Sequence, residues 1–376
     1  MEGTVSPSGP ASLPLGVRRV LDLLFFGLVP LLPFLPIAAQ VIARRHYVAD
    51  GWFFDVHWLW VGWGHVAHGQ NPYVDFLYPA PAAVLPAPLG FLGYRPAVII
   101  WLLILVASIV VALRVLGVRD WRCYSLALLA MPAYSSIHIG TPTPLLMLAA
   151  ACAWRYRDRR WVVAAAIAFA IGFKIFLWPL LIWLAVTRFR TAVSAVLVTA
   201  ALVIGCWAII GFAGVTGPNG YGHRLVGTEN IDQYRGYSVI AFAHKLGLGG
   251  HGSRAVGVLV ALVALGVIVL LGRRNGGDRN AFIAALAASL LASPVVWGHY
   301  FLLALIPLAL ARQHVGLAWL APLAFWVIPQ QENLGSIVPV VLGLGIFLAL
   351  VAWSARDAGR FRPLSHAHAV PSGGLP

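Results

Sequence analysis

Charged side chains are scarce in this sequence of 376 residues. Only 10% of the residues are charged and 60% are hydrophobic, which is too apolar for a soluble globule of this length. Apolar runs of roughly 17 to 25 residues, long enough to cross about 30 Å of hydrocarbon as helix, recur along nearly the whole chain. The composition therefore excludes a soluble enzyme and predicts an all-α integral membrane protein.

Common catalytic and metal-binding patterns are also missing. The sequence has no Gly-rich phosphate loop, no G-x-S-x-G and no paired cysteine spacing. His65 and His68 are one helical turn apart, but His57 is too distant to join them around one ion without bending the chain. The sequence therefore predicts no metal and no cofactor. The three cysteines lie in separate apolar stretches and are expected to be inert: Cys123, Cys152 and Cys206.

Basic residues are distributed unevenly between the polar joints. If the N-terminus is cytoplasmic, 18 of the 26 Lys and Arg residues can lie on the cytoplasmic side, as the positive-inside rule requires. The net charge of +14 is then explained by membrane topology and needs no nucleic-acid partner. We expect a multi-pass plasma-membrane protein with both termini cytoplasmic and residues 44–95 outside.

This arrangement predicts one polytopic bundle of about twelve transmembrane helices over residues 18–356, with cytoplasmic tails at 1–17 and 357–376. Residues 78–94 contain four prolines and are interpreted as a re-entrant or interfacial piece, with a true span as the alternative. The expected spans are 20–42, 96–115, 122–138, 142–155, 160–173, 175–187, 190–212, 253–272, 279–294, 300–312, 314–330 and 335–355.

The long first outer loop contains a charge among aromatic residues. Residues 53–68 are predicted to form a helix along the outer interface, because their tryptophans are of the ring type that settles at headgroup depth. An ionised carboxylate near hydrocarbon is costly, so Asp55 should face a protein cavity or a cation. Alternatively, Asp55 caps the helix by accepting backbone N–H bonds. The tryptophans are Trp52, Trp58, Trp60 and Trp63.

The order of several short motifs resembles a known class of enzymes. An Asp in the first outer loop, GQNPY at 69–73 and a Tyr-Pro pair at 78–79 resemble the GT-C class of membrane glycosyltransferases. AIAFAIGFKIFLWPLLIW at 166–183 and SPVVWGHY at 293–300 resemble glycosyltransferase family 87. Two departures are GTPTP at 140–144, where the family would have Gly-Gln-x-Asn, and Val56, where an aromatic residue usually follows the acid.

The resemblance implies an inverting transferase that moves mannose from a polyprenyl-phosphate donor to a glycolipid or polysaccharide acceptor on the outer face. Arabinofuranose is the alternative sugar. Asp55 would be the general base, with Asp50 and Asp75 as alternatives. Cations at the outer rim would stabilise the departing phosphate. The residues expected to bind donor phosphate or substrate are Lys174, His299, Arg235, Tyr73, Tyr78 and Thr141.

Two other interpretations remain open at this point. Lys174 could snorkel to the interface and His299 could bond a neighbouring carbonyl, in which case neither has a catalytic role. A transporter or lipid flippase is the rival class, but the sequence has no internal repeat and almost no charge within its spans apart from Lys174. An enzyme site requires Asp55, Lys174 and His299 to converge within about 10 Å.

The topology can be tested by cysteine labelling in intact cells. We expect Gln70→Cys to react with an impermeant thiol reagent added from outside and Arg157→Cys to be protected. Protection of position 70 together with reaction at position 157 would mean that the chain is inserted the other way round.

Overall fold

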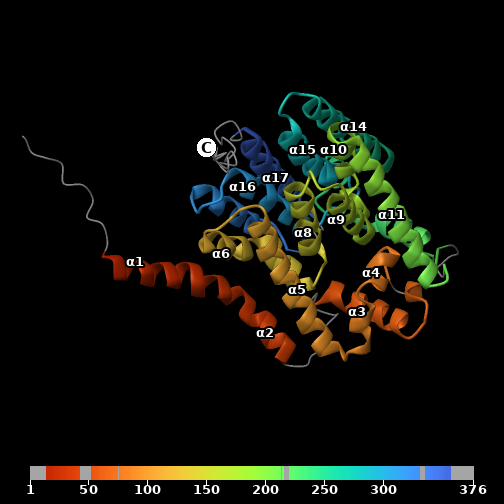
Figure 1. Ribbon diagram of the computed structural model, residues 1–376, viewed down its shortest axis with the longest axis horizontal. Helices are drawn as coiled ribbons and strands as arrows, with labels where there is room; N and C mark the ends of the chain where they lie inside the picture. The colour runs from red at the N-terminus through yellow and green to blue at the C-terminus, as the bar shows by residue number, and fades with distance from the viewer. Residues whose placement is uncertain are drawn as a thin grey trace, which may run out of the picture.

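The computed structural model describes residues 14–42, 52–74, 76–212, 214–215, 220–330 and 335–356. Within these ranges the chain forms helices joined by short connections and contains no β-strand. Figure 1 shows most helices gathered in one bundle, with the first helical segment extending away from it. The all-α prediction is confirmed.

Five helical segments are long and apolar enough to cross a membrane. They are Arg19–Ile42, α5 (Tyr94–Val115), α11 (Phe189–Ile209), α14 (Gly250–Gly272) and α17 (Val338–Arg356). The first segment comprises α1 (Leu15–Asp22), a π-helical turn η1 (Leu23–Leu28), a 3₁₀ stretch η2 (Val29–Phe34) and α2 (Leu35–Ile42). Pro30 and Pro33 lie in η2, where their missing N–H groups disfavour regular α-helix. These segments support a membrane protein, while the number of crossings stays a prediction.

Shorter helices make up much of the rest of the bundle. They are α6 (Trp121–Leu129), α7 (Met131–Ile139), α8 (Thr143–Arg155), α9 (Arg160–Phe173), η5 (Ile175–Leu177), α10 (Pro179–Thr187), α15 (Asp278–Leu291), η6 (Gly298–Ala304), α16 (Leu305–Ala311) and η7 (Leu317–Val327). At 1.5 Å per residue, a helix of about 14 residues covers roughly 21 Å, less than the hydrocarbon core. Residues 122–138 were expected as one span but form α6 and α7, because Ala130 is extended immediately before Met131 and Pro132.

The polar segments also contain helices. Residues 78–94 form two pieces of five residues each, α4 (Ala80–Val84) and η4 (Ala87–Phe91), neither long enough to cross a bilayer. The first loop contains α3 (Phe54–Ala67) and η3 (Pro72–Val74), and the second contains α12 (Tyr221–Asp232) and α13 (Val239–Lys245). The helix expected over 53–68 is therefore present as α3.

One tryptophan of α3 departs from the expected interfacial position. Trp63 is fully buried, because η4 packs closely against α3, and its Nε1 donates a hydrogen bond to the Ala82 carbonyl at 2.9 Å. Its ring centroid lies 4.9 Å from that of Trp101 in α5. The backbone of Gly90 lies so close to the Trp63 backbone that a side chain there would overlap it. Trp63 thus belongs to the protein core and not to a headgroup belt.

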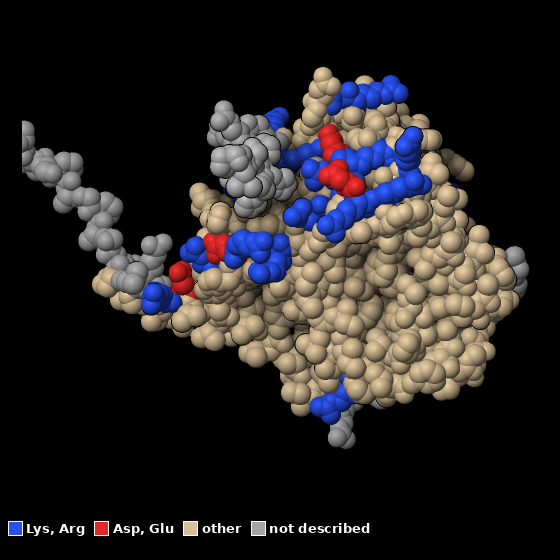
Figure 2. Space-filling model, viewed as in Figure 1, with Lys and Arg blue, Asp and Glu red and all other residues tan. Residues whose placement is uncertain are grey.

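Charged side chains gather on one end of the molecule. In the view of Figure 2, Lys and Arg lie mainly in the region where Figure 1 shows α6, α10 and α14, with a broad uncharged surface beneath them. Helices α3 and α4 lie at the opposite end of the same view. This distribution is the one that the positive-inside rule predicts for a protein with one basic cytoplasmic face.

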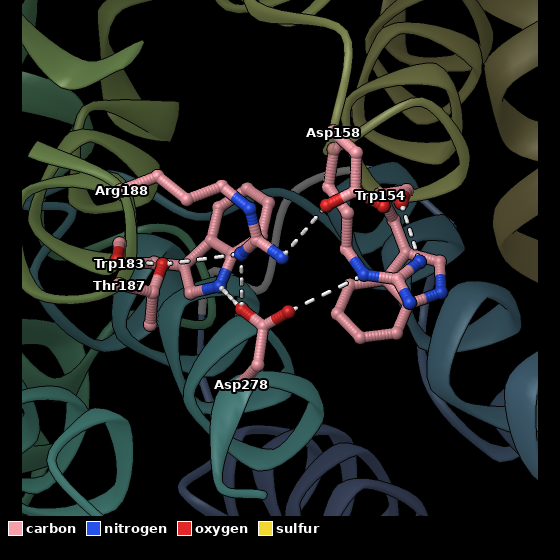
Figure 3. A network of polar contacts seen from close by, with 7 residues as sticks. Trp154, Asp158, Trp183, Thr187, Arg188 and Asp278 are labelled. Carbon is pink, nitrogen blue, oxygen red and sulfur yellow. Dashed lines mark hydrogen bonds and ion pairs between the residues drawn. The ribbon is translucent and has the colours of Figure 1, made fainter. Parts of the chain in front are cut away.

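An ion-pair network centred on Asp278 links three connections at the basic end (Figure 3). Its carboxylate accepts hydrogen bonds from Arg188 Nη1 and Trp183 Nε1, both at 2.8 Å, and lies 3.3 Å from Arg157 Nε. Arg188 also pairs with Asp158 at 3.3 Å. Since Asp278 is the first residue of α15, its negative charge is also favoured by the positive end of the helix dipole.

Replacing Asp278 by Asn should destabilise the bundle. The variant leaves two half-buried guanidinium groups without their shared carboxylate, and hydrogen bonds to charged groups contribute about 2 kcal/mol each. We expect a clearly lower midpoint of thermal unfolding in detergent.

Asp158→Asn is the matched control for that measurement. Asp158 is 81% exposed and, within the described part of the chain, pairs with Arg188 alone, and exposed ion pairs contribute little to stability. Equal melting of the Asp278→Asn and Asp158→Asn proteins would show that the network does not stabilise the bundle.

Candidate active site

The site begins at a strained turn that places Asp55. Phe53 is buried and has the left-handed backbone conformation (φ 54°, ψ 25°), which is uncommon for a residue with a side chain. Its N–H donates to the His138 carbonyl of α7 at 2.9 Å. Helix α3 starts at the next residue, so the turn fixes Asp55 in the first helical turn, beside the end of α7.

The Asp55 carboxylate is bonded to Tyr78 and does not cap α3. The Tyr78 hydroxyl donates to Asp55 Oδ2 at 2.6 Å, a short bond of the kind expected for an ionised acceptor. The N-cap residue of α3 is Phe53, and this cap has no side-chain hydrogen bond. Burial raises the pKa of Tyr78 well above its usual value, and the Asp55 carboxylate raises it further. Tyr78 therefore remains a neutral donor that orients the carboxylate.

Tyr73 contacts the backbone of Tyr78. Its hydroxyl donates to the Tyr78 carbonyl at 3.1 Å, and its ring stacks on Trp207 of α11 with centroids 4.8 Å apart. Tyr221 of α12 packs edge-on against Tyr73 at 5.8 Å. Tyr73 was expected to contact substrate, but it is 1% exposed and its hydroxyl is used within the protein, so its observed contacts hold the loop that contains Tyr78.

Lys174 lies in the break between α9 and η5 and contacts the ring of Tyr78. Its extended backbone (φ −149°, ψ 120°) interrupts the helices. The ammonium donates to Thr141 Oγ1 at 3.2 Å and to the Tyr300 hydroxyl at 3.3 Å. It also lies 5.1 Å from the ring centroid of Tyr78 and 4.6 Å from that of Tyr300, within cation–π range. Lys174 is thus engaged inside the protein, and the snorkelling interpretation does not describe its position.

Thr141 is positioned by the close contact of two elements. Gly140 ends α7 with φ +75°, and a Cβ there would lie 2.6 Å from Val56 Cβ, so both the conformation and the contact require glycine. The Gly140 carbonyl accepts from Trp101 Nε1 at 2.8 Å. Val56 therefore packs the start of α3 directly onto the turn before Thr141, and this contact brings Asp55 and Lys174 to one place.

His299 and Tyr300 complete the cluster from η6. His299 is 4% exposed, its ring centroid lies 4.8 Å from that of Tyr300, and its Nε2 has no hydrogen-bond partner among the residues that the structure describes. Buried polar atoms without partners are rare, and they often mark a place where a ligand binds. Thr143 Oγ1, in the same GTPTP segment as Thr141, is a second buried atom of this kind.

The remaining site residues predicted from the sequence are Arg235, Asp50 and Asp75. Arg235 lies on the turn after α12, near Tyr237, whose N–H donates to the Val296 carbonyl at 2.6 Å. Asp50 and Asp75 lie outside the described residues. Over the described ranges, no group of three or more His, Cys, Asp and Glu side chains has the arrangement of a metal site.

Two residues of this region were missed by sequence reasoning. Tyr300 follows His299 in SPVVWGHY, and its position in that motif was the available signal. Tyr221 starts α12, where burial and, as a smaller cause, the neighbouring Tyr300 phenol raise its pKa. Nothing in its local sequence indicates that α12 folds back beside the first outer loop.

A helical membrane protein in which one carboxylate and one ammonium contact the same tyrosine, beside further hydroxyl groups, is suited to transfer chemistry that needs a base and a cation. The sequence pattern of glycosyltransferase family 87 matches residues 76–298, more than half of the chain. The chain belongs to this family and is a glycosyltransferase.

Two curated relatives share this similarity over most of their length. A protein of Mycolicibacterium smegmatis is 24% identical over 366 residues, covering 87% of this chain and 80% of the relative. One of Mycobacterium tuberculosis is 26% identical over 336 residues, covering 79% and 71%. Both are named polyprenol-phosphate-mannose-dependent alpha-(1-2)-phosphatidylinositol pentamannoside mannosyltransferase. No solved structure matches the chain at a significant level.

Proposed function

We propose that this protein transfers mannose from a polyprenyl-phosphate donor to a glycolipid at the outer face of the plasma membrane. The observation that carries the proposal is that Asp55 and Lys174 both contact Tyr78, because this reaction needs a base for the acceptor and a cation for the leaving phosphate. The names of the two mycobacterial relatives support a mannosyl donor and a phosphatidylinositol mannoside acceptor.

Asp55 acts as the general base in this proposal. Tyr78 holds Oδ2, and Oδ1 accepts the proton of the attacking acceptor hydroxyl. The acceptor oxygen forms a bond to the anomeric carbon while the bond from that carbon to the phosphate oxygen breaks. Polyprenyl phosphate leaves with the electron pair of that bond. A single displacement of this kind inverts the anomeric centre, unlike a two-step reaction through a covalent intermediate.

Lys174 stabilises the charge that grows on the departing phosphate. Its ammonium is held in place by Thr141 and Tyr300 before any ligand arrives, so little reorganisation is needed during the reaction. The unpartnered Nε2 of His299 is suited to bond a phosphate oxygen or a sugar hydroxyl. Arg235 stays a candidate for the outer rim of the donor site.

The direct assay uses purified protein in lipid with a radiolabelled polyprenyl-phosphate mannose and a phosphatidylinositol mannoside acceptor. The proposal expects a labelled glycolipid product that carries one additional mannose. Transfer from a polyprenyl-phosphate arabinofuranose instead, with no product from the mannosyl donor, would contradict the choice of sugar.

Asp55→Asn should abolish most of the transfer without unfolding the protein. Asparagine keeps the shape and can still accept the Tyr78 hydrogen bond, but it cannot take up a proton. We expect the rate to fall by roughly 10² to 10⁴, the usual contribution of a positioned base, with an unchanged melting midpoint.

The matched controls are Asp50→Asn and Asp75→Asn, which change the other two acids of the same loop. Both should retain transfer close to that of the parent. If Asp55→Asn turns over donor within a few-fold of the parent while one of the controls is inactive, the base is the aspartate replaced in that inactive control.

A further inference from the structure

Tyr300 has a buried hydroxyl group that the proposed mechanism has so far used only to hold Lys174. The side chain comes from η6 and is 8% exposed. Its oxygen lies 3.3 Å from Lys174 Nζ, and Thr141 Oγ1 lies 3.2 Å from the same nitrogen. The ammonium is therefore shared between two hydroxyl oxygens from separate elements.

The direction of these bonds is fixed by the chemistry of lysine. An ammonium group has three hydrogens and no acceptor, so Tyr300 and Thr141 must accept. The phenolic hydrogen of Tyr300 is thus not used in the bond to Lys174, and no acceptor for it occurs among the described residues. A hydroxyl that accepts from a cation becomes a better donor, because hydrogen bonds in a chain polarise one another. The third hydrogen of the ammonium is unused in the same way.

The ring of Tyr300 is held rigidly. It stacks on Phe176 with centroids 4.5 Å apart and planes 8° from parallel, and the edge of the His299 ring contacts it at 4.8 Å. Phe176 lies two residues after Lys174, so one short turn carries both the cation and the residue that orients the phenol. Donors that are fixed before a ligand arrives stabilise an anion more than donors that must be reoriented.

The two tyrosines that flank Lys174 use their hydroxyl groups differently. Tyr78 donates to the Asp55 carboxylate, whereas the Tyr300 hydroxyl donates to no carboxylate of the described residues. Hydroxyl and ammonium donors that converge on one place without an acceptor form a site for an oxyanion. The charge and the acceptor oxygens of a phosphate group match this donor set.

We propose that the Tyr300 hydroxyl donates a hydrogen bond to a non-bridging phosphate oxygen of the polyprenyl phosphate, beside the third hydrogen of Lys174. This inference rests on the proposed function, since it assigns the phosphate end of the same donor. It makes Tyr300 a phosphate ligand and leaves orientation of the base to Tyr78.

The test measures binding of a short-chain polyprenyl monophosphate, which carries no sugar, to the purified full chain in detergent. Tyr300→Phe removes one oxygen and keeps the ring that stacks on Phe176. Because a hydrogen bond to a charged group is lost, we expect the dissociation constant to rise by about tenfold or more. The uncharged polyprenol of the same length should bind both proteins equally.

Tyr124→Phe is the matched control. The Tyr124 hydroxyl donates to the Val118 carbonyl at the connection between α5 and α6, so this variant also loses one hydroxyl group from the fold. It should bind the phosphate as the parent does. A double-mutant cycle with Lys174→Gln provides a second measurement. The loss of phosphate affinity caused by Tyr300→Phe should be smaller in the Lys174→Gln protein than in the parent, because the two side chains bind the same group.

An unchanged phosphate affinity of Tyr300→Phe would overturn the inference, as would an equal loss of affinity for polyprenol. This outcome is separable from failure of the proposed function, because the probe contains no sugar. Transfer of a different sugar would leave the phosphate result intact, whereas a parent protein that binds no polyprenyl phosphate would overturn both.

Discussion

An ionised carboxylate at the edge of an apolar bundle is stable only if the protein surrounds it with donors, and this requirement organises the site around Asp55. The Tyr78 hydroxyl supplies the nearest donor at 2.6 Å. Lys174 lies 5.1 Å from the centroid of the Tyr78 ring and supplies the compensating positive charge.

The distance between acid and cation depends on packing rather than on their own bond. Val56 lies against Gly140, and Gly140 precedes the threonine that holds Lys174. The left-handed conformation of Phe53 adds a second fixed point through its bond to the His138 carbonyl. Such strained residues are maintained when the surrounding contacts overdetermine them, as they do at many functional sites. The opposite end of the bundle is fixed separately by the Asp278 network (Figure 3).

Much of this arrangement could be predicted from the sequence, and the rest could not, for physical reasons. Hydrophobic run lengths and prolines indicated most helix bounds, and motif order indicated Asp55, Lys174, Thr141 and His299. The break at Ala130 was missed because a run of apolar residues looks the same whether it is one helix or two. Trp63 was placed at the interface because an isolated aromatic helix gives no sign that α4 and η4 will cover it. The role of Tyr300 depends on a contact across 126 residues, which no local pattern encodes.

The central claim is that the phosphate of the donor binds at Lys174, in the same site as Asp55. An electron cryomicroscopy structure of the protein in lipid nanodiscs with a short-chain polyprenyl monophosphate would test it most directly. The account predicts a phosphate oxygen about 3 Å from Lys174 Nζ, the usual length of a hydrogen bond from nitrogen to oxygen. Phosphate density at the basic end near Arg157 and Arg188, with the space beside Lys174 and Asp55 unoccupied, would contradict it.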